Sequence, residues 1–253
     1  MSELRISLLH LRLKPAALAS NYALLERGIL AAAATGADWI VTPELCISGY
    51  QFVEIIGTDW ISEQPDEWTR CVREMARSLK RVIWFAHAER AVDHKIHNTV
   101  SLIDVDGAII AYHRKIITHA ESWASSGEVM QPTNCSGIKV GVLICADAYT
   151  AVIAQTLKSK GAQLLISPAA WAPGLNGPKG EWEQRTVETG LPLIVCNRTG
   201  TEGTLAFDSA ESLVIKNGQR LLSYSSQRSA VLTFNWNLKD MASASDEFEI
   251  TSL

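Results

Sequence analysis

Short apolar segments alternate with longer stretches of helical apolar spacing along most of this chain, and that alternation constrains its fold more than any other feature. Short apolar runs are typical of buried strands, whereas apolar residues three and four positions apart indicate a helix packed on a sheet. The predicted strands span residues 5–11, 38–41, 82–88, 98–105, 108–113, 138–144, 163–167, 191–196, 212–216, 220–224 and 230–236, and the predicted helices span residues 16–34, 65–80, 151–159 and 177–189. Helices alternate with strands early and hairpins dominate late, so we expect a layered α/β fold with mixed sheets.

Length and composition favour one large domain, residues 1–253. The chain is 47% hydrophobic and 20% charged, which is sufficient for a continuous core, and no Pro/Gly/Ser-rich linker divides it. No apolar run reaches the roughly 18 residues that a membrane helix requires. The first residues also lack the pattern of a secretory signal, so a cytoplasmic protein is expected.

The charge balance and the cysteines limit the possible partners. With 23 Lys and Arg against 27 Asp and Glu, the chain has no basic surface typical of nucleic-acid or membrane binding, and we expect neither partner. The five cysteines form no CxxC pair, which predicts free thiols rather than a zinc site. Glycine-rich nucleotide-binding motifs and a serine nucleophile elbow are also missing, and His94 and His97 fit a solvated loop. We therefore expect no metal and no cofactor.

Three chemically reactive side chains each follow a predicted strand. Glu44 comes after residues 38–41, Lys115 after residues 108–113, and Cys145 after residues 138–144. Because ligands of α/β proteins usually bind beyond the carboxyl ends of strands, these groups are candidates for one site. A thiol, a carboxylate and an ammonium form a plausible set for acyl transfer from an amide.

Each residue type has a defined use in that chemistry. A thiol with an ordinary pKa of about 8.5 needs a nearby cation or a helix N-terminus to lower its pKa, and Lys115 or the helix after Cys145 would supply it. Glu44 would accept the thiol proton if burial raises its pKa. The Lys115 ammonium and the backbone N–H of Ala146 would stabilise the oxyanion.

Each of these residues also has a purely structural interpretation. Cys145 would be a buried core thiol, Glu44 a loop or helix-cap carboxylate, and Lys115 a solvated surface charge. Only their joint occurrence makes the catalytic interpretation competitive. Three aromatic residues lie close in sequence to these candidate site residues and would line a substrate pocket or simply belong to the core: Tyr50, Trp123 and Trp171.

Several motifs, in order, resemble those of the nitrilase superfamily of carbon–nitrogen hydrolases over nearly the whole chain. They are Pro43-Glu44-Leu45 with Ser48-Gly49-Tyr50, His113-Arg114-Lys115, Gly141 to Asp147 around Cys145, Ser167-Pro168-Ala169-Ala170-Trp171, Glu181-Trp182, and Val195 to Gly200. The resemblance implies a four-layer α-β-β-α sandwich with two mixed β-sheets, assembled as a homodimer or a larger homo-oligomer. It also implies that Cys145 is the nucleophile, Glu44 the general base and Lys115 the oxyanion stabiliser, with Glu121 as a second glutamate that orients the lysine.

The departures from the family pattern favour its amidase-like branch. The small Ala146 follows Cys145 where many members carry an aromatic residue, and Cys145-Ala146-Asp147 differs from the Cys-Trp-Glu of nitrilases. We therefore expect a hydrolase that cleaves a linear amide or an N-carbamoyl compound through a Cys thioester and releases ammonia or an amine.

Other functions stay open at this point. One is a nitrilase acting on a nitrile, and another is a catalytically silent binding or scaffold protein, suggested by Ala146 and the short loop around Glu121. A third is a redox role for Cys46 or Cys145. The polar, acidic residues 240–253 are expected to form a frayed tail or an arm that docks on a neighbouring subunit.

Overall fold

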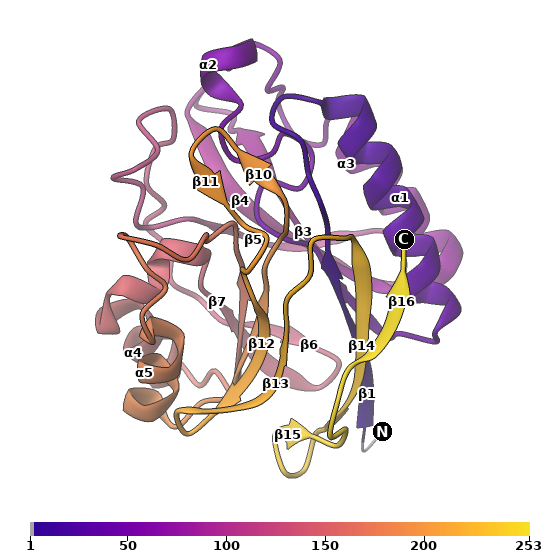
Figure 1. Cartoon of the computed structure of the whole chain (residues 1–253), viewed down its shortest axis with the longest axis vertical. Helices are drawn as coiled ribbons and strands as arrows, with labels where there is room; N and C mark the ends of the chain where they lie inside the picture. Colours follow the sequence, from indigo (N-terminus) through magenta and orange to yellow (C-terminus); the bar gives the residue numbers. More distant parts are fainter. Residues whose placement is uncertain (1–2) are drawn as a thin grey trace.

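A large mixed β-sheet forms one half of this computed structural model, which describes residues 3–253 (Figure 1). Its strands are β1 (Glu3–His10), β2 (Trp39–Val41), β3 (Val82–Arg90), β4 (Ile96–Ile103), β5 (Ile109–Arg114), β14 (Ala230–Asn237), β15 (Ala242–Ser243) and β16 (Glu249–Ser252). Their order is β15-β14-β1-β2-β3-β4-β5, with β16 also paired to β14. Strands β1, β2 and β3 run parallel and the other pairs run antiparallel, so the sheet is mixed.

The second half of the molecule is built on a smaller mixed sheet. Its strands are β6 (Thr133–Cys135), β7 (Ile138–Val142), β8 (Leu164–Pro168), β9 (Leu193–Cys196), β12 (Ser212–Lys216) and β13 (Gln219–Tyr224), in the order β13-β12-β9-β8-β7-β6. The central strands β7, β8 and β9 are parallel and almost wholly buried, which is typical of strands covered on both faces. A separate hairpin, β10 (Thr201–Glu202) and β11 (Leu205–Ala206), follows β9.

Helices cover the outer face of each sheet. On the first sheet lie α1 (Leu18–Ala34) and α3 (Glu67–Leu79), whose buried apolar residues pack in one cluster with those of β2 and β3. On the second sheet lie α4 (Ala151–Ser159) and α5 (Glu181–Thr189), which contact each other and strands β7 and β12. A single turn of helix, α2 (Val53–Ile56), and a 3₁₀ turn, η1 (Cys145–Tyr149), complete the structure. The predicted four-layer α-β-β-α sandwich is confirmed.

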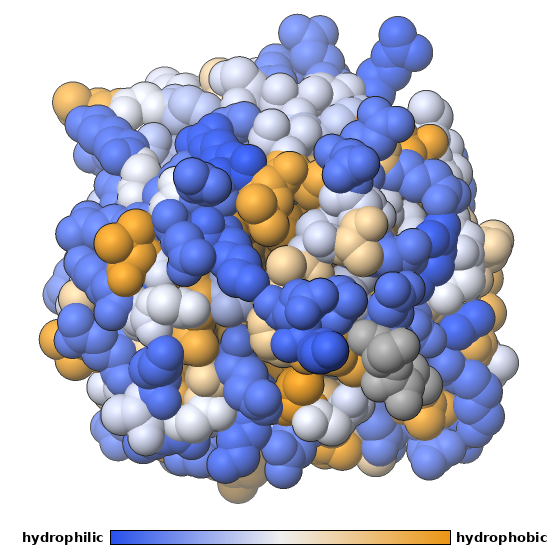
Figure 2. All heavy atoms as spheres, turned by 90° about the horizontal axis from the view of Figure 1, so that it is seen from below, coloured by the Kyte–Doolittle hydropathy of each residue, from blue (hydrophilic) through white to orange (hydrophobic). Residues whose placement is uncertain are grey.

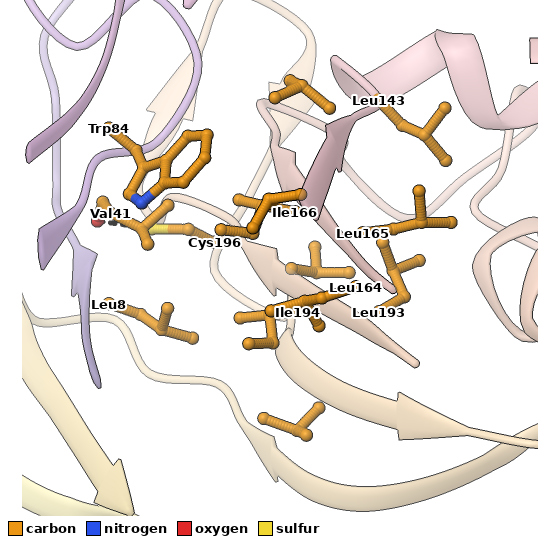
Figure 3. Close-up of a cluster of buried hydrophobic side chains, with 14 of the residues drawn as sticks. Leu8, Val41, Trp84, Leu143, Leu164, Leu165, Ile166, Leu193, Ile194 and Cys196 are labelled. Atoms are coloured by element: carbon orange, nitrogen blue, oxygen red, sulfur yellow. Dashed lines mark hydrogen bonds between the residues drawn. The ribbon is translucent and has the colours of Figure 1, made fainter. Parts of the chain in front are cut away.

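The main core lies between the two sheets (Figure 3). Leu8, Val41 and Trp84 project from the first sheet toward Ile166 and Ile194 of the second, and all five are at most 1% exposed. Burial of a side chain of this size contributes about 1.5–3 kcal/mol to stability. The packing of these side chains therefore sets the position of one sheet relative to the other.

Several predicted elements are shorter in the structure, and two of them show a clear backbone reason. The strand predicted over residues 138–144 ends at Val142, because the chain turns into η1 at Cys145, whose φ of 48° is incompatible with a strand. The helix predicted over residues 177–189 begins only at Glu181, since Gly180 before it has a left-handed φ of 96°.

The frayed tail considered for the C-terminus is wrong. Residues 240–253 are ordered against their own chain, because β15 and β16 pair by backbone hydrogen bonds with β14. Phe248 is also buried, with its ring 5.6 Å from that of Phe234. Backbone pairing and one aromatic contact hold this polar segment, and neither produces a hydrophobic period in the sequence.

The surface fits the near-neutral composition of the chain. Figure 2 shows a face on which hydrophilic residues dominate and apolar residues are scattered among them. Within residues 3–253, no helix combines the length and the hydropathy needed to cross a membrane.

The packing between the sheets can be tested by shortening one side chain. We expect Ile194→Ala, in the centre of the main core, to lower the free energy of unfolding by about 2–5 kcal/mol, because the deletion leaves a cavity. Ile250→Ala is the control, since Ile250 is 51% exposed and its loss should change stability by no more than about 0.5 kcal/mol. Urea denaturation measures both, and equal effects would contradict the assigned core.

Candidate active site

The first sheet brings Glu44, Asn98 and Lys115 together. Glu44 lies in the turn after β2, and this turn is held along β3, where Cys46 N–H donates to Ala86 O at 3.0 Å. Lys115 directly follows β5, and its backbone N–H donates to the carbonyl of Asn98 on β4 at 2.8 Å. Backbone pairing thus places the three side chains at one end of the sheet.

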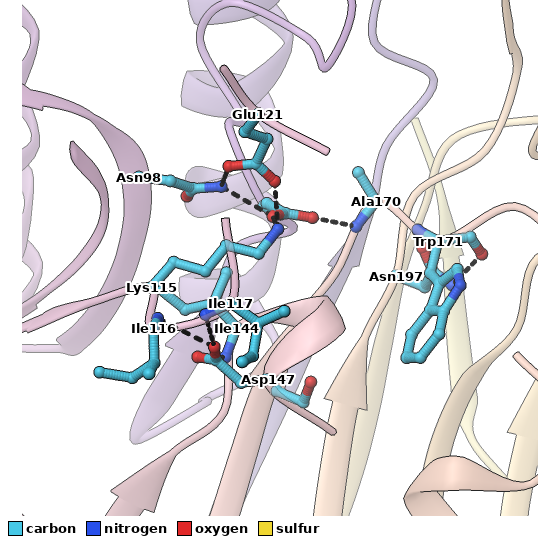
Figure 4. A network of polar contacts seen from close by, with 12 residues as sticks. Asn98, Lys115, Ile116, Ile117, Glu121, Ile144, Asp147, Ala170, Trp171 and Asn197 are labelled. Atoms are coloured by element: carbon cyan, nitrogen blue, oxygen red, sulfur yellow. Dashed lines mark hydrogen bonds and ion pairs between the residues drawn. The ribbon is translucent and has the colours of Figure 1, made fainter. Parts of the chain in front are cut away.

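The Glu44 carboxylate is the centre of a buried hydrogen-bond network, and its partners Asn98, Lys115 and Ala170 are labelled in Figure 4. Its Oε1 accepts from Lys115 Nζ at 2.7 Å and from Asn98 Nδ2 at 2.8 Å, and its Oε2 accepts from the backbone N–H of Ala170 at 2.8 Å. Ala170 follows β8 of the second sheet, so this carboxylate links the two sheets. Glu44 has no exposed surface, and each of its oxygens accepts a charged or an amide donor.

Glu121 completes the surroundings of the ammonium. Lys115 Nζ also donates to Glu121 Oε1, and Asn98 Nδ2 donates to Glu121 Oε2 at 3.0 Å. Lys115 is 1% exposed and Glu121 is 3% exposed, so both charges are removed from water. Asn98 therefore donates to both glutamates, and Lys115 is held between them.

Cys145 reaches this group from the second sheet. It follows β7 as the first residue of η1, with a left-handed φ of 48° that is uncommon for a residue with a side chain. The thiol is buried. It lies close enough to Glu44, Lys115 and Glu121 for their charges to shift its pKa, and the backbone N–H of Ala170 is near it. Ala146 comes next and is half-buried. Glu44, Lys115, Glu121 and Cys145 thus lie around one point between the sheets.

Asp147 joins the segments that carry Lys115 and Cys145. Its Oδ1 accepts from the backbone N–H of Ile116 at 2.9 Å and of Ile117 at 2.8 Å. Its Oδ2 accepts from the N–H of Ile144 at 2.9 Å. A fully buried carboxylate therefore fixes the residues just after the lysine against the residue just before the cysteine.

Burial and charge shift the pKa values of these groups. Burial lowers the pKa of Lys115, but the attraction of Glu44, Cys145 and Glu121 outweighs it and raises this pKa well above its usual value. Burial raises the pKa of Glu121; Lys115 opposes this shift and Glu44 adds to it. The ammonium is therefore charged throughout the neutral range, whereas the ionisation of Glu121 is disfavoured.

The prediction of a lowered thiol pKa is wrong. Burial and the nearby Glu44 carboxylate raise the pKa of Cys145 well above its ordinary value, and Lys115 only partly offsets them. At neutral pH the group is therefore a thiol and not a thiolate. A neutral thiol beside a carboxylate can react as a nucleophile when the carboxylate accepts its proton during attack. The fixed ammonium can stabilise negative charge that develops on the substrate oxygen.

The three aromatic residues lie in two separate groups. The Tyr50 ring lies 5.9 Å from Lys115 Nζ, and both Tyr50 and Trp123 pack in the cluster of Leu45 and Phe52. Trp171 follows Ala170, but its indole N–H donates to Asn176 O, and its ring packs against other aromatic rings. Of these three aromatic residues, Tyr50 is the one whose ring faces a charged site residue, Lys115.

Cys46, considered for a redox role, and a large surface hollow lie outside this cluster of four residues. Cys46 has no exposed surface, and burial raises its pKa to about 12, which is unfavourable for the redox role considered for it. A hollow of about 450 Å³ is lined by His97, Tyr112 and Arg114 together with neighbouring loop residues. None of the four clustered site residues lines it.

Sequence reasoning did not find several groups in this network. Asn98 is a lone polar residue in a strand, and the only signal was its place at the start of an apolar run. The N–H of Ala170 has no sequence signature. Asp147 was noted only as part of the cysteine motif, although three backbone N–H groups converge on it.

Comparison with known proteins gives a consistent result. The carbon-nitrogen hydrolase family matches residues 5–244. A Pseudomonas protegens protein named "Hydrolase in pqqF 5′region" is 33% identical over 86% of this chain and 78% of its own. An omega-amidase of Danio rerio is 26% identical over 99% of this chain and 94% of its own. The crystal structure of an amidase from Nesterenkonia sp. matches with a TM-score of 0.82 and 25% identity, covering 97% of this chain and 92% of that one.

The raised pKa of Glu121 gives a pH-dependent prediction. A carboxyl group whose pKa is higher in the folded than in the unfolded chain holds its proton more tightly when folded, so its stabilising contribution is lost as pH rises. The free energy of unfolding of the wild type, minus that of Glu121→Gln, should therefore fall as pH rises above about 4.5, the ordinary glutamate pKa. Denaturation at a series of pH values measures this difference, and a rise with pH would contradict the assignment.

Proposed function

Because this chain belongs to the carbon–nitrogen hydrolase family and is an amidase-type hydrolase, we propose that it cleaves a linear amide or an N-carbamoyl compound through a thioester on Cys145. One observation supports this proposal most directly: the Lys115 ammonium is enclosed between two buried glutamates, Glu44 and Glu121, and the Cys145 thiol lies beside them. No purely structural need explains a buried lysine with two acidic partners next to a thiol.

The proposed reaction begins with attack of the Cys145 sulfur on the amide carbonyl carbon. As the C–S bond forms, the thiol proton passes to Glu44, and the carbonyl oxygen gains negative charge. The Lys115 ammonium and the backbone N–H of Ala146 stabilise this oxyanion. Glu44 then gives its proton to the leaving nitrogen, the C–N bond breaks, and ammonia or an amine departs from the thioester.

Water completes the cycle. Glu44, again a carboxylate, takes a proton from a water molecule that attacks the thioester carbonyl, and the returning charge on oxygen again faces Lys115. Collapse of this intermediate breaks the C–S bond, returns the proton to sulfur and releases a carboxylic acid or a carbamic acid. Glu121 acts by orienting Lys115, because its carboxylate is bonded to Nζ.

The relatives support an amide or carbamoyl substrate over a nitrile. Besides the omega-amidase, a citrullinase of Francisella tularensis is 29% identical over 73% of this chain. One Nesterenkonia structure, 25% identical with a TM-score of 0.84, carries the acetamide moiety of fluoroacetamide on its active site cysteine. A protein named as a nitrilase, from Pyrococcus abyssi, is 27% identical, so the nitrile alternative is kept as an arm of the test.

Substrate contacts and assembly complete the proposal. Tyr50, Trp123 and Trp171 are proposed to border the substrate, with Tyr50 the best supported because its ring lies over Lys115. The enzyme is proposed to act in the cytoplasm as a homodimer or larger homo-oligomer, a state that sedimentation would measure. Ammonia release from short amides, ω-amides, N-carbamoyl compounds and nitriles, read alongside the intact mass of the protein, identifies the substrate class.

The nucleophile can be tested directly. Cys145→Ala should lower amide turnover by about 10⁴-fold or more, because no acyl-enzyme can form, while the folded structure is kept. The control is Cys71→Ala, which removes an exposed thiol on α3 and should leave turnover unchanged. Ammonia release and the mass of a trapped acyl adduct are the measurements. Undiminished turnover in Cys145→Ala would exclude the mechanism, and a wild type with neither turnover nor adduct would favour the silent scaffold.

A further inference from the structure

Another buried ion pair, between Arg198 and Glu202, lies close to the site without belonging to it. Arg198 follows β9 and Glu202 ends β10, and the guanidinium Nη1 donates to Glu202 Oε1. Neither residue is more than 1% exposed. Arg198 Nη2 also donates to the carbonyl of Leu13 at 2.5 Å, and its guanidinium lies 4.5 Å from the ring of Phe207. This pair is therefore fixed on several sides.

The second carboxylate oxygen of Glu202 accepts hydrogen bonds from a loop that is about 150 residues away in the sequence. Glu202 Oε2 accepts from the backbone N–H of Tyr50 at 2.9 Å and from that of Gln51 at 2.8 Å. Gly49 fits against the same carboxylate, since a Cβ there would lie 2.7 Å from Glu202 Oε1 and its φ is 72°. The backbone of residues 49–51 is thus in close contact with the Glu202 carboxylate.

Tyr50 connects this loop to the reacting groups. Its ring lies 5.9 Å from Lys115 Nζ and packs in the cluster that contains Ala170 and Phe207. The N–H of Ala170 in turn donates to Glu44. A shift of the Tyr50 backbone would therefore move a ring that lies over the ammonium.

Stability alone does not account for the pair. Taking two charges out of water costs several kcal/mol per ion, and well-packed apolar residues often replace such pairs without loss. The two backbone donors accepted by Glu202 point instead to placement of the loop. We propose that the Arg198–Glu202 pair is a positioning device that sets Tyr50 over Lys115, and that Tyr50 contacts the substrate; this inference rests on the proposed amide hydrolysis.

The test is a double-mutant cycle of Glu202→Asp with Tyr50→Leu. Aspartate keeps the charge opposite Arg198 but is one methylene too short to reach the Tyr50 and Gln51 N–H groups. We expect Glu202→Asp to lower kcat/KM about tenfold when Tyr50 is present and less than twofold in the Tyr50→Leu background, because the effect passes through that ring. If Glu202→Asp does not fold, Glu202→Gln, which keeps the length, enters the same cycle.

Glu89→Asp is the matched control. Glu89 is also a buried glutamate paired with an arginine, Arg114. Its carboxylate accepts a hydrogen bond from Thr99 on β4, whereas Asn98, the preceding residue of β4, donates to Glu44 in the site. Successive strand residues point to opposite faces, so Glu89 faces away from the site. The control should lose stability and keep kcat/KM. Equal losses from Glu202→Asp in both backgrounds, or a loss no larger than that of Glu89→Asp, would overturn the proposal.

A second readout separates this inference from the proposed function. In a Cys71→Ala background, the same cycle is run on the rate at which iodoacetamide alkylates Cys145, followed by intact mass. A wild type without amide turnover would reject the proposed function, and the alkylation cycle would still decide the role of Glu202. With turnover present, additive effects reject the positioning role alone.

Discussion

The site depends on one interaction, the enclosure of the Lys115 ammonium by Glu44 and Glu121. Two carboxylates cannot remain charged side by side out of water without a cation between them, and a lysine cannot remain charged there without an anion. Asn98 adds the remaining support by donating to both glutamates. Removal of Lys115 would leave the buried glutamates without a cation, and removal of Asn98 would leave each glutamate short of a hydrogen-bond donor, so the four side chains act as one unit.

The geometry of that unit is set by the packing of the two sheets. Glu44, Asn98 and Lys115 come from the first sheet, whereas Cys145 and the N–H of Ala170 come from the second. The side chains between the sheets therefore determine the distance from the thiol to the carboxylate. A small displacement of the thiol from the carboxylate would slow the reaction strongly. The dense packing of the core therefore affects the reaction rate, because it holds the two sheets at a fixed distance.

The sequence predicted the strands and helices well because apolar runs and helical spacing report burial directly. It also predicted the α-β-β-α layers, through the resemblance to a family and not through periodicity. Strand β16 was missed because backbone hydrogen bonds hold a polar segment without an apolar pattern. The contacts of Asn98, Asp147 and Glu202 were missed for a related reason. Each forms hydrogen bonds to residues distant in sequence, and such bonds leave no local signal.

The raised thiol pKa of Cys145 has a consequence for the proposed mechanism. A preformed thiolate would place a further negative charge beside the ammonium, which burial and the two glutamates disfavour. Transfer of the proton to Glu44 during attack avoids this state, because Glu44 loses its charge as the substrate oxygen gains one. Lys115 then faces the same number of negative charges before and after attack, so the surrounding dipoles need little reorganisation. That constancy is the condition under which a preorganised site lowers a reaction barrier most effectively.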